Sequence, residues 1–305
     1  MFPRPPSPGR SLAASILAAA TLLAGCSDPR PLAPGEYRLD SRAVDESSGL
    51  ARSQRDPQRL WTLNDSGDDP VLYALDTRGH ALGRLRIAGA ANEDWEDLAS
   101  YDDHGTPTLL VADVGGNIRR RPFVTLYWIE EPDSIPAPGT TGRTTVPYRT
   151  LRVRFPDGPR DCEAVAVDVA AGRIYLLSKR DPLPRLYAVP LDPQSESVTA
   201  EALGEIRIPR APAHHPHPEY IDWISAMDIS PDGRSLVAVS LTQAHVYRRR
   251  HRESWPQALR RAPTSFGLPP FEQIEAVTWA ADGRAIYVSS EGRPMPLARI
   301  ELRHP

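Results

Sequence analysis

The chain has 305 residues, of which 40% are hydrophobic, and its 36 Lys and Arg residues nearly balance its 39 Asp and Glu residues, for a net charge of −3. A chain of this length can bury the core of one large domain or of two smaller ones. The near-neutral charge gives no reason to expect a nucleic-acid polymer as a partner. The 33 prolines and 20 glycines interrupt short runs of Val, Ile, Leu and Tyr, which predicts an all-β protein.

Residues 1–26 read as a targeting segment and not as part of the fold. Two arginines precede an apolar stretch at residues 11–23, which is too short to span a bilayer easily, and Cys26 ends a Leu-Ala-Gly-Cys sequence. This sequence resembles the lipobox of bacterial lipoproteins, in which the cysteine is lipidated and becomes the mature N-terminus. We therefore expect Cys26 to anchor the protein to a membrane, with residues 27–35 as a short stiff tether.

Two other interpretations of this segment stay open, an ordinary secretory signal cleaved near Ala24 and an anchor that is not cleaved. Ser27, and not Asp, follows the cysteine. By the sorting rule known for some Gram-negative bacteria, this indicates the outer membrane. We expect a monomer attached to the periplasmic face of the outer membrane.

A short pattern recurs five times in the rest of the chain, each time with Ser or Glu first, a small or acidic residue second and an apolar residue third. The repeats are roughly 50 to 70 residues apart, which suits a four-stranded propeller blade with its loops. The residues that begin the repeats are Ser48, Glu96, Glu163, Ser225 and Glu275.

These repeats predict a five-bladed β-propeller that occupies residues 36–305 as a single domain. In each blade we expect four antiparallel strands, separated by turns rich in Asp, Asn, Gly and Pro such as the one at residues 64–70. The fifth blade is one strand short, and residues 36–39 provide the missing strand, which covers the last sheet edge. A six-bladed propeller is the alternative, with a degenerate blade within residues 130–160 or 248–270.

Equivalent positions on the inner strands of a propeller face one axis, so we expect the five repeat residues to lie close together. Glu96, Glu163 and Glu275 bring three negative charges, which is unfavourable unless a cation or a raised pKa relieves the repulsion. With the hydroxyls of Ser48 and Ser225 they form an all-oxygen set that favours Ca²⁺, and no His or Cys cluster accompanies them to indicate zinc. Alternatively, the glutamates hydrate a channel or accept hydrogen bonds from neighbouring amides.

The order Ser, Glu, Glu, Ser, Glu on five inner strands resembles the calcium-activated nucleotidases, or soluble apyrases, which are five-bladed propellers with a central Ca²⁺. Three further segments are similar: the acidic turn at residues 63–67, residues 110–117 in the second blade and residues 178–180 in the third. The chain is also similar to bacterial lipoproteins of unassigned function and, more distantly, to phytase-like esterase propellers.

The resemblance implies hydrolysis of nucleoside diphosphates or triphosphates, with the metal holding phosphate oxygens. It implies catalytic roles for Asp65 and Glu96, next to the metal or the attacking water. The turn has Asn64 where the nucleotidases have Asp, and the basic residue that follows it there is missing, so the substrate class stays open. The basic residues implied to neutralise phosphate are Lys179, Arg180, Arg119, Arg120 and Arg293.

A non-catalytic propeller is the second hypothesis. In that case Ca²⁺ only fastens the blades, and the loop face holds a glycan, a peptide or another partner in the cell envelope. Propellers serve both purposes, so the fold does not decide between them. The ligand is therefore expected to be either a phosphorylated small molecule or an envelope component.

Overall fold

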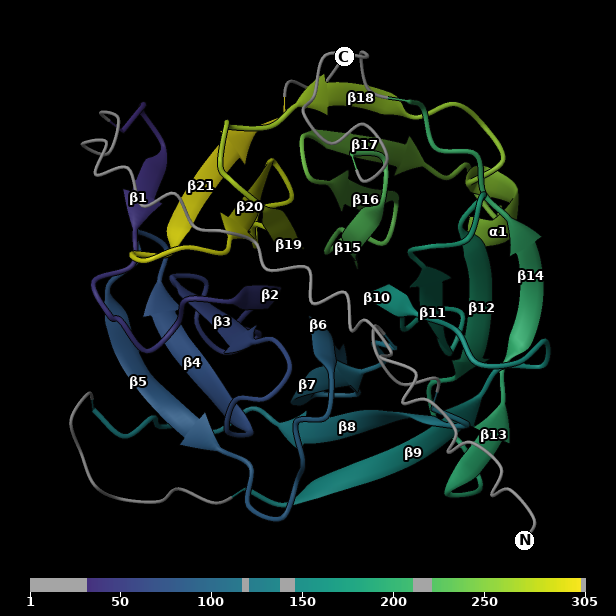
Figure 1. Cartoon of the computed structure of the whole chain (residues 1–305), viewed down its shortest axis with the longest axis horizontal. Helices are drawn as coiled ribbons and strands as arrows, with labels where there is room; N and C mark the ends of the chain where they lie inside the picture. Colours follow the sequence, from purple (N-terminus) through teal and green to yellow (C-terminus); the bar gives the residue numbers. More distant parts are fainter. Residues whose placement is uncertain (1–31, 117–120, 138–145, 211–220, 303–305) are drawn as a thin grey trace, which may run out of the picture. The chain divides into compact units, whose positions relative to one another are not determined.

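The computed structural model describes residues 32–116, 121–137, 146–210 and 221–302. The unit that begins at Ala33 consists almost entirely of β-sheet, and α1 (Trp255–Ala258) is the only helix in the described ranges. Five sheets surround a common centre, and the first strand of each sheet lies nearest to it (Figure 1). The chain is therefore a five-bladed β-propeller, as the repeats predict.

Each blade has four antiparallel strands, which follow one another from the centre outward. Blade 1 contains β2 (Ser47–Arg52), β3 (Arg59–Asn64), β4 (Val71–Asp76) and β5 (Ala81–Arg86). Blade 2 contains β6 (Trp95–Asp103), β7 (Thr106–Asp113), β8 (Val124–Glu130) and β9 (Tyr148–Arg154). Blade 3 contains β10 (Cys162–Asp168), β11 (Arg173–Ser178), β12 (Arg185–Pro190) and β14 (Glu201–Glu205). Blade 4 contains β15 (Ile224–Ile229), β16 (Ser235–Ser240), β17 (Gln243–Arg248) and β18 (Thr264–Gly267). Blade 5 contains β19 (Ile274–Trp279), β20 (Ala285–Ser290), β21 (Pro296–Glu301) and β1 (Glu36–Arg38).

The strand β1 closes the ring by completing blade 5. It pairs with β21 in antiparallel register, with Glu36 opposite Ala298, so the predicted closing strand is confirmed. The pairing covers an edge of β21 that would otherwise be open to other strands. The six-bladed alternative is wrong, because the described part of residues 130–160 contains the fourth strand of blade 2, and residues 248–270 contain α1 and the fourth strand of blade 4.

A further strand, β13 (Ser197–Thr199), is not predicted by the repeats. It belongs to the loop between β12 and β14 of blade 3, but it pairs in parallel with β9 of blade 2, with Ser197 opposite Arg152. A strand of three residues, two of them exposed, has no periodicity from which it could be detected. The pairing ties blade 3 to blade 2 at the outer edge.

The hydrophobic core lies between the blades. Five clusters of buried side chains each combine two neighbouring blades. In one of them Trp61 of blade 1 packs with Trp95 of blade 2, and both side chains are fully buried. Because each blade has a neighbour on both faces, both faces of its sheet are apolar, and their burial stabilises the ring. This packing fixes the inner strands and the side chains at their ends.

Candidate metal centre

A β-bulge lies at the start of each inner strand, at the residue that begins the sequence repeat. The pairing register between the first and second strands of every blade skips this residue, as between Cys162 and Ala164 in β10. A bulge turns a side chain out of the regular alternation of a strand. The five predicted positions are therefore structurally equivalent, one in each blade. They are Ser48, Glu96, Glu163, Ser225 and Glu275.

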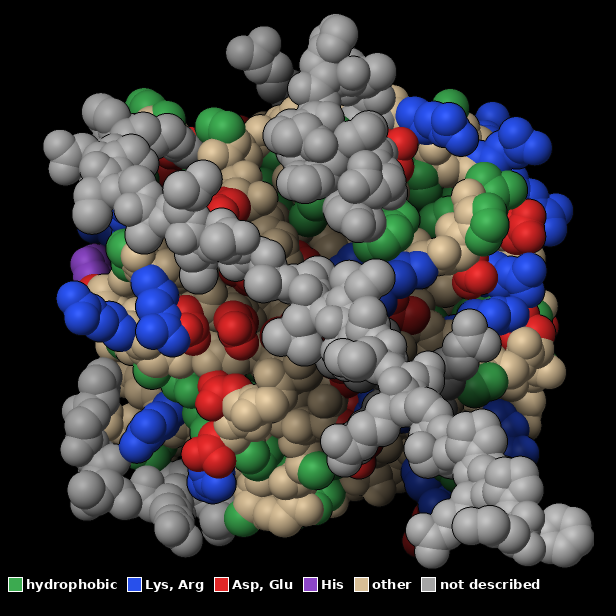
Figure 2. Space-filling view, in the orientation of Figure 1, with side chains coloured by type: hydrophobic (Ala, Val, Ile, Leu, Met, Phe, Trp, Pro, Cys, Tyr) green, Lys and Arg blue, Asp and Glu red, His purple; other side chains and the backbone are tan. Residues whose placement is uncertain are grey.

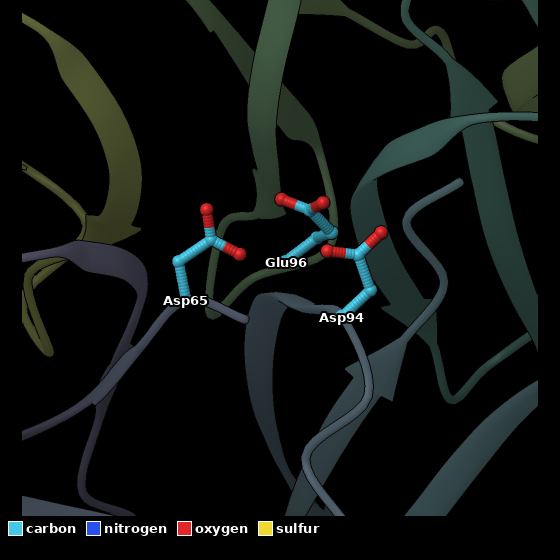
Figure 3. A group of neighbouring side chains, drawn as sticks. All are labelled: Asp65, Asp94 and Glu96. Atoms are coloured by element: carbon cyan, nitrogen blue, oxygen red, sulfur yellow. The ribbon is translucent and has the colours of Figure 1, made fainter. Parts of the chain in front are cut away.

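Carboxylates from four blades gather at this end of the propeller in three groups. Within a group, one oxygen from each residue lies within 4.8 Å of the others. Asp65, Asp94 and Glu96 form the first group, and their side chains point toward one another (Figure 3). The second group contains Glu96, Asp161 and Glu163, and the third contains Asp65, Glu275 and Glu291. These acidic residues could together hold a metal ion, with Asp65 and Glu96 each shared by two groups.

Four of these carboxylates lie outside the sequence repeat, at two other equivalent positions. Asp94 and Asp161 directly precede β6 and β10, whereas Asp65 and Glu291 directly follow β3 and β20. Each blade therefore has three positions that can direct a side chain to the centre, and the repeat contains only one of them. In three blades, the residue directly after the second strand donates a backbone hydrogen bond to the residue directly before the first strand. The donors and acceptors are Asp65 and Glu46, Lys179 and Asp161, and Glu291 and Gln273.

Asp94, Asp161 and Glu291 are not among the residues predicted from sequence. Asp94 and Asp161 each lie two residues ahead of a repeat glutamate, and Glu291 follows the second strand of its blade at the position that Asp65 has in blade 1. The spacing of these residues in the sequence indicates that they face the centre, but this can be recognised only when the ends of the strands are known.

Glu96 has one oxygen without a hydrogen-bond partner. Its side chain is only 1% exposed, and its Oε1 has no donor within the described residues. The other oxygen, Oε2, lies 3.4 Å from Ser48 Oγ. A buried carboxylate oxygen without a donor is unfavourable. A cation among Glu96, Asp65 and Asp94 would satisfy it.

Gly115 leaves space beside two of these carboxylates. A Cβ atom on this residue would overlap Glu96 Oε1 and would lie 2.5 Å from Asp94 Oδ2. The amide of Gly115 donates to the carbonyl of Asp94 at 3.2 Å, a bond that a charged residue makes in blades 1, 3 and 5, although Gly115 lies two residues beyond its strand and not one. The missing side chain allows the two carboxylates to approach one another.

Lys179, the only lysine of the chain, lies within the acidic ring. Its Nζ is 2.8 Å from Glu163 Oε2 and 3.7 Å from Glu275 Oε1, and its side chain is 11% exposed. Burial alone would lower the pKa of this ammonium, but the two carboxylates outweigh burial and raise it. Lys179 thus neutralises part of the ring, and its contact with a phosphate stays a prediction. Arg119 and Arg120 lie outside the described residues.

Arg180 and Arg293 form ion pairs near the ring. Arg180 Nη1 lies 2.9 Å from Asp161 Oδ2, and the guanidinium lies 5.3 Å from the centroid of the Trp223 ring. Arg293 pairs with Asp45, and its side chain is 68% exposed. Both cations pair with carboxylates at the end of the propeller where the acidic groups gather, and their contact with a phosphate stays a prediction.

The hydroxyls of Ser48 and Ser225 bridge neighbouring blades. Ser48 Oγ donates to the carbonyl of Glu96 at 2.9 Å, and Ser225 Oγ donates to the carbonyl of Ile274 at 3.1 Å. Each bond ties an inner strand to the inner strand of the next blade. Metal ligation by the two serines stays a prediction.

Four of the seven carboxyls hold protons more tightly than carboxyls in water. Burial raises the pKa of Asp65 to about 7, and it raises that of Glu163 to about 7 in spite of the nearby Lys179. Burial and repulsion from Glu275 raise the pKa of Glu291 to about 8. Burial and the charge of Glu163 hold the pKa of Glu96 well above its ordinary value. A metal ion would replace these protons and relieve the repulsion.

No protein-family model matches the chain, and no curated protein matches it. Among solved structures it is similar to a gluconolactonase from Xanthomonas campestris, with 12% sequence identity and a TM-score of 0.45, over 84% of this chain and 72% of that chain. Similarity at this level carries no information on the substrate. The resemblance to calcium-activated nucleotidases stays a prediction.

Proposed function

We propose that the protein is a calcium-dependent hydrolase of phosphoesters or phosphoanhydrides, with the cation bound by Asp65, Asp94 and Glu96. The observation that carries the proposal is the buried Glu96 Oε1, which has no donor in the described residues and lies beside two further carboxylates. The space next to Gly115 supports it, because a side chain there would exclude the arrangement.

The composition of the site favours Ca²⁺ over other metals. Across the described ranges, neither His nor Cys belongs to the three carboxylate groups, which weighs against zinc and copper. Ca²⁺ accepts six to eight oxygen ligands in a loose geometry, whereas Mg²⁺ requires a nearly regular octahedron. Ligands that come from separate blades suit the looser requirement.

A bound Ca²⁺ would polarise a phosphoryl oxygen and lower the pKa of a coordinated water. Glu291 is not one of the three proposed ligands, but it belongs to the third carboxylate group, which includes the ligand Asp65. The side chain of Glu291 is partly exposed. Its pKa of about 8 in the metal-free ring keeps it protonated at neutral pH, and a cation next to Asp65 would lower this pKa toward the range of a group that accepts a proton from water. Gln273 Nε2 donates to Glu291 Oε1 at 2.8 Å and orients the carboxyl.

A pocket of about 890 Å³ lies along the turn that follows β3 and is lined by both neighbours of Asp65, although none of the seven carboxylates lines it. Its lining includes Ser66, Asp68, Arg86 and Arg293. On the face shown in Figure 2, acidic and basic side chains gather over blade 1. An arginine that pairs with a surface carboxylate can exchange it for a phosphate oxygen, so the two arginines are suited to hold an anionic substrate.

A phosphate-release screen tests the proposed reaction. It compares nucleotides, phytate and simple phosphoesters, each with calcium and with a chelator. We expect release from at least one of these classes only when calcium is present. No release from any of them by calcium-loaded protein would contradict the hydrolase.

Replacement of Glu291 by Gln is expected to lower kcat about 100-fold or more, because the amide cannot accept the proton of the attacking water. Calcium affinity, measured by calorimetry, should change little, since the three proposed ligands remain. Glu301→Gln, which changes an exposed glutamate of β21, is the matched control and should keep full activity. A loss of calcium affinity as large as the loss of kcat would contradict this role for Glu291.

A non-catalytic calcium-fastened propeller is the second candidate. The observation that favours it is that each carboxylate group takes its members from two neighbouring blades, so that a cation bound there would join those blades. This function predicts that calcium raises the thermal stability but supports no turnover. The loop face would then bind a glycan or a peptide of the cell envelope.

We also propose that Cys26 is lipidated and holds the protein on the periplasmic face of the outer membrane. The support is the lipobox-like sequence, since residues 1–31 lie outside the described residues. No helix in the described ranges is long and apolar enough to cross a membrane. Membrane fractionation of cells expressing Cys26→Ala should find the protein released, and an unchanged membrane fraction would contradict the anchor.

A further inference from the structure

A second group of carboxylates adjoins the proposed calcium site. Glu96 belongs to both groups, with Asp65 and Asp94 on one side and with Asp161 and Glu163 on the other. A carboxylate has two oxygens and can therefore serve two metal ions at once. The geometry thus contains two adjacent positions of three carboxylates with one residue in common.

We propose that the ring binds two divalent cations that share Glu96 as a bridging ligand. The second position consists of Glu96, Asp161 and Glu163. The proposal rests on the calcium site described above, and it adds a second ion to that site.

An unpaired oxygen supports the second position independently of the first. Glu163 is 1% exposed, and its Oε1 has no hydrogen-bond partner in the described part of the chain. Lys179 approaches only the other oxygen, Oε2. Glu163 is not a member of the first group, and the neighbour that it meets there, Glu96, is itself a carboxyl, so a single cation in the first position would leave two buried carboxyls facing each other.

The charge of the ring is the second argument. The three groups contain seven different carboxylates, and among the described residues Lys179 and Arg180 form ion pairs with them. One divalent cation together with Lys179 and Arg180 would neutralise four of the seven charges, and two divalent cations would neutralise six. Because the carboxylates are largely buried, this difference is weakly screened by solvent.

Neighbouring protein groups also orient the carboxyl of Asp161 in the second position. Asp161 Oδ1 accepts a hydrogen bond from the amide of Gly116 at 2.8 Å, and its Oδ2 faces Arg180. These contacts fix the carboxyl next to Glu163. Outer contacts of this kind orient metal ligands and are part of the binding site.

The third group, by contrast, is already occupied by side chains of the protein. Gln273 Nε2 donates to Glu275 Oε1 and to Glu291 Oε1, each at 2.8 Å, and Lys179 Nζ lies 3.7 Å from Glu275 Oε1. The amide of Gln273 therefore bridges two of its three carboxylates, whereas in the second position Glu96 Oε1 and Glu163 Oε1 have no such donor among the described residues. The ring is inferred to hold two cations and not three.

A pair of cations that share a carboxylate indicates the class of substrate. Two metal ions about 3.5 to 4 Å apart stabilise both the attacking and the leaving oxygen in a displacement at phosphorus. This arrangement fits a phosphate ester or anhydride better than a neutral lactone or sugar, since each cation can take one phosphoryl oxygen.

Calorimetric titration of the mature protein with calcium chloride tests the proposal. We expect about two equivalents for the wild type, and about one for both Asp94→Asn and Asp161→Asn, because each removes a ligand of one position only. Glu96→Gln should lose both. Asp282→Asn, at an exposed turn of blade 5, is the matched control and should keep two equivalents.

The stoichiometry of the wild type decides the proposal even if a variant fails to fold, which circular dichroism would reveal. A single equivalent in the wild type would overturn the second cation and leave the first site intact. No binding at all would overturn the proposed function as well. Loss of all calcium binding in both Asp94→Asn and Asp161→Asn would likewise contradict two separate positions, because each substitution should abolish only one of them.

Discussion

Replacement of Gly115 by Ala is expected to weaken calcium binding about 10- to 100-fold without unfolding the protein. The new Cβ would overlap Glu96 Oε1 and crowd Asp94 Oδ2, so the two carboxylates would have to separate. In the metal-free protein they can do so, because the ends of flexible side chains are involved. In the calcium-bound protein they cannot, because the cation requires both. Calorimetry gives the affinity, and thermal unfolding in chelator gives the stability.

Gly267→Ala is the matched control for this substitution. A Cβ on Gly267, in the outermost strand of blade 4, would meet no atom within 4 Å, and its backbone does not require glycine. Calcium affinity should be unchanged in this variant. Wild-type affinity in Gly115→Ala would show that the carboxylates beside it do not bind the ion.

The metal-free protein is expected to become less stable as the pH rises from 5 to 8, by about 3 kcal/mol. Asp65, Glu163 and Glu291 have pKa values of about 7, about 7 and about 8 in the folded protein, above those of unfolded carboxyls. Between pH 5 and 8 the folded state therefore binds more protons than the unfolded chain, and raising the pH favours unfolding. The three groups titrate together, so the effect is smaller than the sum of their separate shifts.

Calcium should largely offset this loss of stability. A bound cation stabilises the ionised carboxylates, and at 100 times its dissociation constant it adds about 2.7 kcal/mol to the free energy of unfolding. Urea unfolding at several pH values, in chelator and in calcium, measures both effects. Stability that increases with pH in chelator, or that is the same with and without calcium, would contradict the proposed origin of the raised pKa values in the ring.

The architecture was predictable because it repeats. Each inner strand carries the same short pattern, and the apolar runs between the turns mark the other strands, so five blades and the closing strand at Glu36 follow from periodicity. The strand β13 was not predictable, since it is too short and polar to show a pattern and its pairing depends on how two blades meet.

The candidate site was predictable in part. Glu96, Glu163 and Glu275 were found because they begin the repeats, and the structure places all three in the carboxylate groups. Asp94, Asp161 and Glu291 occupy positions just outside the strands, where acidic residues are also common in ordinary turns. Gly115 leaves room for the carboxylates of Glu96 and Asp94 because it has no side chain, and only the distances to these two residues reveal this role.

Lys179 shows the limit of reasoning from residue types. A lysine next to an arginine after a strand predicts a phosphate contact, which stays a prediction, but residue types alone do not reveal the ion pair of its Nζ with Glu163. Strand register decides this, because Lys179 follows β11 at the position that Asp65 and Glu291 hold in other blades. The equivalent position directs all three side chains to the centre.

The affinity of the mature protein for calcium, compared between the wild type and Glu96→Gln, tests the central claim most directly. Glu96 takes part in both proposed positions, and its buried Oε1 is without a donor in the described residues. We predict measurable calcium binding by the wild type at neutral pH and an affinity at least about 100-fold weaker in the variant, which corresponds to about 2.7 kcal/mol. Equal affinities, with both proteins folded, would contradict the site.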